Sequence, residues 1–170
     1  GVVRTLDHVV HELRGMGHEV KVLSHDGKKT WGLPSYPEIQ LAFYSQKEIA
    51  RIVENFQPDC IHIATEGPIG LAARRYCINH QLFFTTGFHT KFAEYAAARI
   101  PIPGVEKLAY KMLRWFHGPS QAVLTPTQTV SKELADRGIE RVVTWTRGVE
   151  HGLFRDYGKG TGAARDRPVL

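Results

Sequence analysis

The sequence predicts an α/β fold with a doubly wound, mostly parallel sheet. Helical and strand-like segments alternate along the 170 residues, and each strand with its helix takes up about 20 to 40 residues. The composition is that of a globular protein, with 42% hydrophobic and 23% charged residues. No apolar run approaches the roughly 18 to 20 residues that are needed to cross a bilayer.

The first third of the chain predicts one helix, one loop and two strands. Apolar residues recur at spacings of three and four over residues 2–16, which indicates one apolar face of a helix. Two glycines end this helix, and a strand is expected over residues 18–24. Residues 25–36 are rich in Gly, Pro, Lys and Ser and are interpreted as an exposed loop, which a short strand over residues 39–44 follows.

A capping box then marks the start of a second helix. Ser45 and Glu48 lie three residues apart, which is the spacing at which each side chain reaches the other's backbone N–H. Pro58 ends this helix, and residues 59–65 predict a buried strand.

The centre of the chain continues the alternation. A helix is expected over residues 68–79, with Pro68 in its first turn, where a missing N–H is tolerated. A strand over residues 82–86 follows. Residues 90–117 carry two helical patterns, which Pro101 and Pro103 divide.

The last part of the domain predicts a strand at residues 122–125, a helix at 130–137 and a strand at 141–145. Residues 155–170 are rich in Gly, Lys, Arg and Asp, which is typical of a linker.

Charge and cysteine content favour a cytoplasmic protein with a mildly basic surface. The net charge is +5, but the lysines and arginines are spread along the chain, and no nucleic-acid recognition motif is present, so no nucleic-acid partner is expected. Cys60 and Cys77 stand in apolar segments without a CxxC pair, which predicts two reduced, buried thiols.

Candidate site residues follow three predicted strands, because ligands bind beyond the carboxyl ends of the strands in an open α/β sheet. Residues 65–70 combine Glu66 with glycines at a helix start, although the same pattern is an ordinary way to begin a helix. His89 stands where an imidazole can donate to a sugar hydroxyl or a phosphate, or alternatively cap a helix or fill the core. Arg147, followed by a glycine, fits a phosphate clamp and fits a turn equally well.

Three other features have plainer interpretations. His8 and His11 are spaced for a metal, but no third ligand is evident, so a solvated helix face is expected. His62 is predicted to be a buried, hydrogen-bonded histidine in a strand. The basic helix over residues 105–117 can lie on an anionic membrane, but packing on the sheet through its Leu108–Met112 face is the commoner arrangement.

Seven short segments together carry a family resemblance. Each is unspecific alone, but their order and spacing are specific when taken together. The segments are Gly1-Val2-Val3-Arg4-Thr5-Leu6, Gly17-His18-Glu19-Val20, Pro58-Asp59-Cys60-Ile61-His62-Ile63, Glu66-Gly67-Pro68-Ile69-Gly70, Gly87-Phe88-His89-Thr90, Thr125-Pro126-Thr127 and Arg147-Gly148-Val149-Glu150. Over residues 1–154 the chain resembles the amino-terminal domain of family 4 glycosyltransferases, most closely bacterial members that mannosylate lipids or build sulfoquinovosyl glycolipids.

The resemblance implies half of a GT-B enzyme, in which two Rossmann-like domains face each other across a cleft. Residues 1–154 would form the acceptor-side domain, and residues 155–170 a linker and the start of a donor-binding domain. The family transfers sugar with retention and in general without a metal, so no cofactor is expected and the nucleotide sugar is a substrate. The other partner would be a sugar, polyol or lipid acceptor, with peripheral contact to the inner face of the cell membrane as an option.

The resemblance also assigns roles to five residues. His89 matches the family's histidine near the transferred sugar and is the expected catalytic contact. Gly1 would be the tail of a glycine-rich loop that approaches the donor phosphates, and Arg147 matches a strand-end position that faces the cleft. Glu66 and Thr90 would line the acceptor side.

Two departures from the family pattern set an expectation about activity. The family has a strand and a glycine-rich loop before the position of Gly1, and its donor domain would begin near Val169. These 170 residues alone are therefore expected not to turn over.

The function that the sequence favours is transfer of a hexose, with retention, from a nucleotide sugar to a lipid-linked or polyol-like acceptor. Two alternatives stay open: another GT-B enzyme, such as a sugar-nucleotide epimerase, and a non-catalytic α/β module that binds nucleotides or anions.

Overall fold

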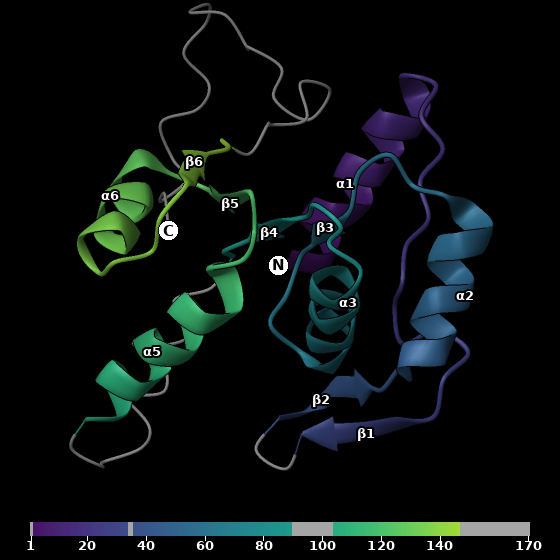
Figure 1. The fold of residues 1–170 in the computed structure, drawn as a ribbon, viewed down its shortest axis with the longest axis horizontal. Coiled ribbons are helices and arrows are strands. Elements are labelled where there is room, and N and C mark those ends of the chain that lie inside the picture. The colour runs from purple at the N-terminus through teal and green to yellow at the C-terminus, as the bar shows by residue number, and fades with distance from the viewer. Residues whose placement is uncertain (1, 34–35, 90–103, 147–170) are drawn as a thin grey trace, which may run out of the picture.

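The computed structural model describes residues 2–33, 36–89 and 104–146 (Figure 1). Helices and strands alternate along most of this part of the chain. In order, they are α1 (Val2–Gly15), β1 (Thr30–Leu33), β2 (Tyr36–Ala42), α2 (Gln46–Phe56), β3 (His62–Ile63), α3 (Pro68–Asn79), β4 (Thr85–Gly87), α5 (Val105–His117), β5 (Ala122–Thr125), α6 (Gln128–Asp136) and β6 (Val142–Thr144).

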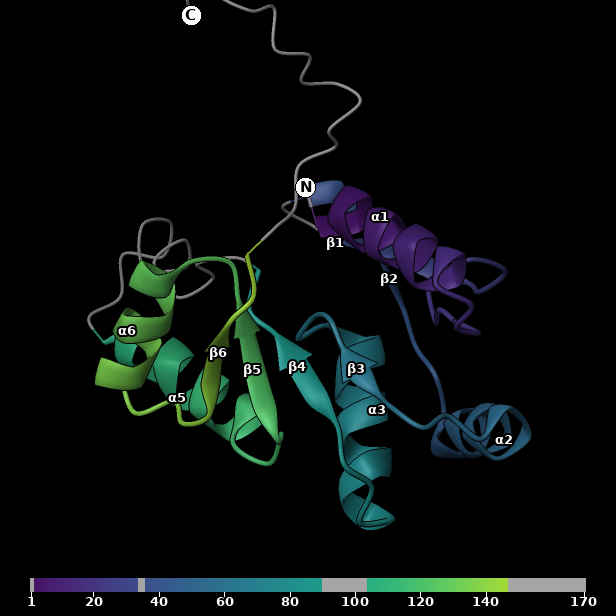
Figure 2. The ribbon, with the colours of Figure 1, turned by 90° about the horizontal axis from the view of Figure 1, so that it is seen from above.

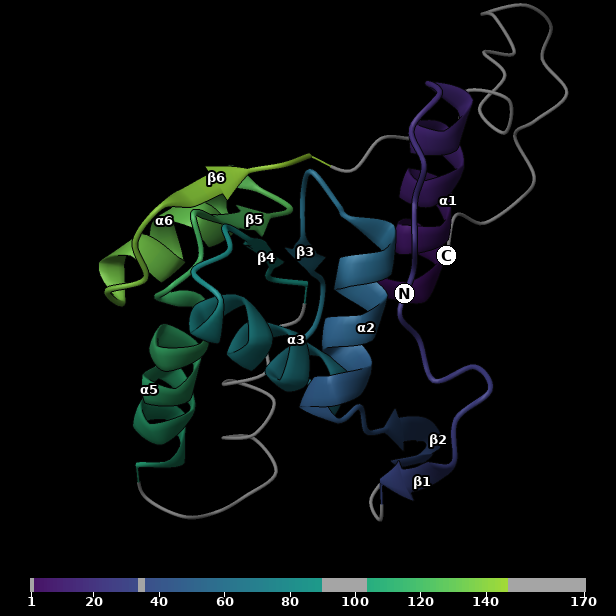
Figure 3. The same ribbon diagram turned by 45° about the vertical axis from the view of Figure 1, so that its right-hand side comes forward.

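A four-stranded parallel sheet forms the centre of the fold. Its strands follow one another in the order β3-β4-β5-β6, and all three pairings are parallel. Helices α3, α5 and α6 connect successive strands, and Figures 2 and 3 show the four strands side by side with these helices beside them. The predicted α/β fold with a parallel, Rossmann-like sheet is therefore confirmed.

Helix α2 begins as the sequence predicts. Ser45 accepts a hydrogen bond from the backbone N–H of Glu48, and the Glu48 carboxylate accepts one from the backbone N–H of Ser45 at 2.9 Å. Lys28 donates a further hydrogen bond to Glu48 and is the largest cause that lowers the pKa of this carboxyl to about 2. The helix ends at Phe56, and Gln57 adopts a left-handed conformation immediately before Pro58.

Two predictions in the first third, one strand and one loop, are wrong. Residues 18–24 form no strand, because no strand of the described chain pairs with them. Part of the expected loop over residues 25–36 is instead β1, which pairs antiparallel with β2 from Thr30 opposite Ala42 onward. An extended segment forms a strand only when a neighbouring strand pairs with it, and composition alone does not reveal that neighbour.

The hydrophobic core lies on both sides of α5. One cluster joins α5 to β5 and α6 through Leu113, Val123 and Leu134, all at most 1% exposed. A second cluster joins α3 and β3 to the end of α5 through Cys77, Ile63 and Phe116. Helices α3 and α5 are thereby fixed on the sheet, and α3 also lies between β3 and α2 (Figure 2).

The end of α5 is held by an arginine of α3. Arg74 is only 7% exposed and donates hydrogen bonds to the backbone carbonyls of Phe116 at 2.9 Å and of Trp115 at 2.6 Å. Its guanidinium also lies over the Trp115 ring, 4.0 Å from the centroid. These bonds satisfy carbonyl groups that the last turn of a helix leaves without partners.

The buried face of α5 is not the predicted one. Leu108 is 68% exposed and Met112 37% exposed, so the expected Leu108–Met112 face is turned away from the sheet. The helix carries apolar residues on two adjacent stripes, and spacing alone cannot choose between them. The residues that it buries are Ala109, Tyr110, Leu113, Phe116 and His117.

Helix α1 forms as expected; none of its residues is buried against the described chain, and Figure 2 shows it standing apart from the sheet. Two burial predictions need correction. Cys77 is a buried free thiol, whereas Cys60 is exposed. His62 is hydrogen-bonded but exposed, because β3 spans only two residues at the edge of the described sheet.

Candidate functional site

The carboxyl ends of the four parallel strands meet at one edge of the sheet, where ligands bind in folds of this class. Glu66 follows β3 and His89 follows β4, so the structure brings both predicted residues to loops at this edge. The predicted residues Gly1, Thr90 and Arg147 lie outside the described part of the chain.

His89 is half-buried beside a small recess. The backbone N–H of Phe88 donates to the carbonyl of Leu124 at 2.8 Å, which continues the pairing of β4 with β5 up to the residue before His89. His89 and four residues from the ends of β5 and β6 line this narrow recess. The four are Leu124, Thr125, Pro126 and Trp145. The backbone just before His89 is therefore fixed by the sheet, and the imidazole lies at the carboxyl edge.

A glycine makes room for two histidine rings. A Cβ atom at Gly87 would lie 2.5 Å from His89 Nε2 and 3.3 Å from His62 Nε2. Any side chain at position 87 would therefore displace the His89 ring, so glycine is required for a close approach.

The neighbouring His62 is held in a neutral state. Its Nδ1 lies 2.9 Å from the hydroxyl of Thr85 across the strand pair. Although His62 keeps part of its surface exposed, the neighbouring strand and His89 exclude water from part of its ring. This loss of hydration, and secondly the charge of His89, lower the pKa of His62 from its ordinary 6.5 to about 4. At neutral pH the His62 ring can therefore donate and accept hydrogen bonds but does not add positive charge.

The loop between β3 and α3 packs unusually tightly. Helix α3 begins with Gly67 as N-cap, without a side-chain cap, and with Pro68 in its first turn. A Cβ atom at Gly70 would lie 1.9 Å from the backbone oxygen of Thr65 and 3.1 Å from Ile63 Cγ2. The first turn of α3 therefore presses directly on the backbone that carries Glu66.

The Glu66 carboxylate lies against a buried histidine. Its Oε1 lies 3.3 Å from Nε2 of His117, and the Glu66 side chain keeps 25% of its surface exposed. His117 is 1% exposed, and its Nδ1 lies 2.8 Å from the hydroxyl of Thr86 in β4. The Thr86 hydroxyl donates to Ser120 Oγ at 3.3 Å, and Ser120 Oγ donates to the carbonyl of His117 at 2.7 Å.

The sequence-based interpretation missed His117. A signal was available, because His117 stands four residues after Leu113 and so falls on the buried stripe of α5. A histidine on such a stripe needs polar partners, but nothing in the sequence indicates which ones.

Hydroxyl groups connect the ends of β5 and β6 to α6. Ser131 Oγ lies 2.5 Å from Thr125 Oγ1 and 2.7 Å from Thr144 Oγ1, and Thr127 caps α6 by accepting from the N–H of Val130. These contacts hold Thr125, which lines the recess beside His89.

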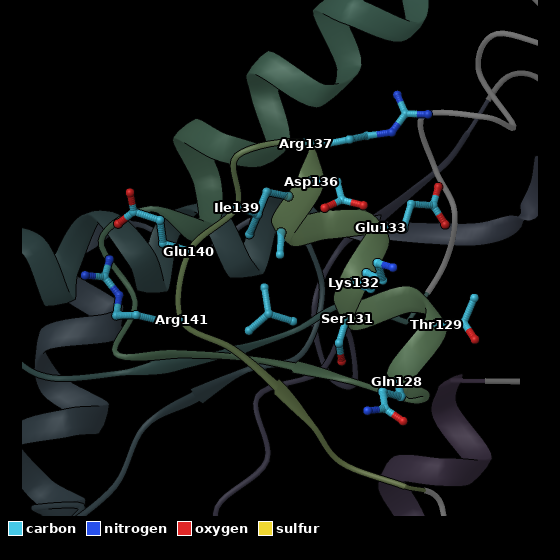
Figure 4. Close-up of a pocket in the computed structure, with 12 residues that line it drawn as sticks. Gln128, Thr129, Ser131, Lys132, Glu133, Asp136, Arg137, Ile139, Glu140 and Arg141 are labelled. Carbon is cyan, nitrogen blue, oxygen red and sulfur yellow. The ribbon is translucent and has the colours of Figure 1, made fainter.

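A larger hollow lies along α6 and β6 (Figure 4) and contains about 1670 Å³ of space that is open to solvent. Lys132 and Arg137 stand beside Glu133 and Asp136 around it, so charges of both signs alternate. This mixed, open surface offers no defined charge to a ligand, and the edge that carries Glu66 and His89 is the better candidate site.

Comparison with known proteins identifies a matching family. The family model described as Glycosyltransferase Family 4 matches residues 1–153. A "GDP-mannose-dependent alpha-mannosyltransferase" of Mycobacterium tuberculosis is 26% identical over 178 aligned residues, which cover 91% of this chain and 45% of that protein. A protein of the same description from Mycolicibacterium smegmatis is 26% identical over 174 residues, which cover 88% of this chain and 44% of that protein. The chain thus spans less than half the length of either relative. No solved structure matches it.

Proposed function

Because the chain belongs to Glycosyltransferase Family 4, we propose that the whole protein is a hexosyltransferase and that this chain is its acceptor-side domain. The observation that carries the proposal is the match of the family model to residues 1–153, which includes both loops of the candidate edge. The fold is the one that a GT-B half requires, but fold alone does not establish a reaction.

The donor in this proposal is a nucleotide sugar, with GDP-mannose as the first candidate. Both relatives are described as GDP-mannose-dependent alpha-mannosyltransferases, and each aligns with about nine-tenths of this chain. The acceptor in the proposal is a polyol or a lipid-linked sugar, which presents several hydroxyl groups to the carboxyl edge of the sheet.

The chemistry demands stabilisation of the departing nucleotide diphosphate while an acceptor hydroxyl attacks the same face of the sugar. In our proposal His89 contacts the transferred sugar and Glu66 accepts a hydrogen bond from the acceptor. Fixed donors and acceptors of this kind stabilise charge that develops in the transition state, because they need no reorganisation during the reaction. Gly1, Thr90 and Arg147 keep the roles that the family resemblance implies for them.

The experiment is a transfer assay with the intact protein, GDP-mannose and two acceptor probes. Myo-inositol serves as a soluble polyol, and octyl glucoside as a glycolipid analogue. Acceptor-dependent release of GDP, with a mannosylated product of α configuration, is the expected result. Activity that persists in EDTA would agree with the expected absence of a metal requirement.

The same assay separates the alternatives. Conversion of the sugar nucleotide without a glycoside product would favour an epimerase. Tight nucleotide binding without any turnover would favour a binding module. Either result would contradict the proposal.

Peripheral contact with the inner face of the membrane is a further part of the proposal. On α5, Leu108 is 68% and Trp115 is 55% exposed, and the exposed Lys107 and Lys111 lie on the same helix. Apolar and basic groups side by side favour an anionic bilayer surface. Within the described residues no helix has the length and apolar character to span a membrane.

Vesicle sedimentation tests this contact. The intact protein is expected to sediment with phosphatidylglycerol vesicles, and the double variant Lys107→Glu/Lys111→Glu is expected to stay in the supernatant. Equal sedimentation of the two proteins would contradict the role of α5.

A further inference from the structure

The mechanism proposed above makes no use of His117, the most thoroughly buried titratable group beside the candidate edge. Its side chain is fully enclosed, while its two ring nitrogens face Thr86 and Glu66. Burial of a polar ring costs free energy unless its nitrogens have partners. Thr86 is the hydrogen-bond partner of Nδ1, whereas Nε2 has no hydrogen bond and faces Glu66, which connects the buried ring to a loop of the site.

The hydrogen-bond directions fix which nitrogen of His117 carries a proton. Ser120 Oγ donates its one hydrogen to the carbonyl of His117, and Thr86 Oγ1 donates its one hydrogen to Ser120 Oγ. Thr86 Oγ1 can then only accept from the imidazole, because a hydroxyl has a single hydrogen. Nδ1 of His117, 2.8 Å away, is therefore the protonated nitrogen.

The proton on Nδ1 limits the states of Nε2, the ring nitrogen that faces Glu66. With Nδ1 protonated, Nε2 is either a bare acceptor or the second N–H of an imidazolium. Nε2 lies 3.3 Å from Oε1 of Glu66, at the distance of an ion pair and without a hydrogen bond between the two atoms. In either arrangement Oε1 lies against the enclosed His117 ring, which limits the orientations that the carboxyl group can take.

We propose that His117 is a positioning residue, which holds Glu66 so that its second oxygen accepts a hydrogen bond from an acceptor hydroxyl. This inference rests on the proposed function. Within residues 2–33, 36–89 and 104–146, Glu66 Oε2 has no hydrogen-bond partner, and a quarter of the side chain is exposed. The tight packing of α3 on Thr65 holds the backbone of the same loop, so the carboxyl group is fixed at both ends. A hydroxyl-bearing acceptor needs such an oriented group, because misplacement by about 1 Å can cost a hundredfold in rate.

Two variants of His117 separate positioning from simple packing. The amide nitrogen of Gln reaches the place of Nε2, whereas the amide nitrogen of Asn reaches only the place of Nδ1. In the intact protein, with GDP-mannose and octyl glucoside, His117→Gln is expected to keep the acceptor KM within about threefold of wild type. His117→Asn is expected to raise it by about ten- to a hundredfold, the effect of losing one polar contact with a charged group, and to leave the donor KM unchanged.

Glu66→Gln completes a double-mutant cycle. In the Glu66→Gln background, His117→Asn is expected to add no further rise in the acceptor KM, because the two residues act as one unit. His80→Gln on the exposed end of α3 is the matched control and is expected to behave as wild type.

Each failure has its own signature. If wild-type protein transfers no sugar, the proposed function fails. If wild type is active but His117→Asn and His117→Gln change the acceptor KM equally, or if His117→Asn acts additively with Glu66→Gln, the inference about His117 fails. If the His117→Asn variant does not fold, nitrogen NMR of the His117 ring is compared between wild type and Glu66→Gln. The Nε2 resonance is expected to shift if His117 contacts Glu66, and an unchanged resonance would overturn the inference.

Discussion

Substitution of Gly70 by alanine tests the packing that holds the candidate loop. The added Cβ would lie 1.9 Å from the backbone oxygen of Thr65, a distance that real Cβ atoms do not show. Rotation of a side chain cannot relieve this contact, because the obstacle is backbone. Helix α3 and the loop must therefore separate by about 1 Å or more.

The expected cost follows from two opposing effects. Overpacking of this kind destabilises a fold by about 1 to 3 kcal/mol. Alanine is the better helix former by about 1 kcal/mol, which offsets part of that loss. The net prediction is a destabilisation of at most about 2 kcal/mol, with faster amide exchange on α3 and a fall in transfer activity because the loop carries Glu66.

Urea unfolding of the intact protein, with amide exchange followed on α3, measures this effect. Gly67→Ala is the control for stability, because a Cβ there would lie 3.8 Å from Thr65 Oγ1, in ordinary contact, and the variant is expected to lose less than about 1 kcal/mol. A Gly70→Ala protein as stable as wild type, with unchanged exchange on α3, would refute the reasoning.

Three further predictions concern the core, a titration and a thiol. Leu113→Ala is expected to cost about 2 to 5 kcal/mol in unfolding free energy, because Leu113 is 0% exposed. Leu108→Ala, at a 68% exposed position of the same helix, should cost less than about 0.5 kcal/mol. Similar losses in the two variants would contradict the assigned helix face. The imidazole of His62 should titrate near pH 4 by NMR. Since its folded pKa lies below the ordinary 6.5, protonation of His62 should lower the free energy of unfolding as the pH falls from 6.5 towards 4. A titration midpoint at 6.5 would contradict the loss of hydration around the His62 ring. Iodoacetamide should modify the exposed Cys60 in native protein and leave Cys77, whose pKa burial raises to about 11, until the protein unfolds; equal labelling of both thiols would contradict the packing of α3.

Local signals in the sequence predicted the elements whose causes are local. The capping box of Ser45 and Glu48 gave the start of α2, and Pro68 marked the first turn of α3. The segment at residues 122–125 is the strand β5, as its short apolar run indicated. In each of these cases neighbouring residues are sufficient to determine the structure.

Elements that depend on distant partners were not predictable in the same way. Residues 18–24 have strand composition but pair with no strand among the residues that the structure describes, while β1 forms because β2 lies opposite. The strand-end rule led to Glu66 and His89 because it follows from topology alone. His117 escaped it, because its importance arises only when α5 folds against β4 and the loop that bears Glu66.

The most direct test of the account is the turnover of GDP-mannose by the intact protein with His89 replaced by alanine. With octyl glucoside as acceptor, His89→Ala is expected to lower kcat by about a hundredfold or more, the usual cost of removing one group that stabilises the transition state. Its thermal stability should match that of His80→Ala, a control at an exposed histidine of α3. A His89→Ala protein that retains wild-type kcat would contradict the central claim that the edge carrying His89 is the site of sugar transfer.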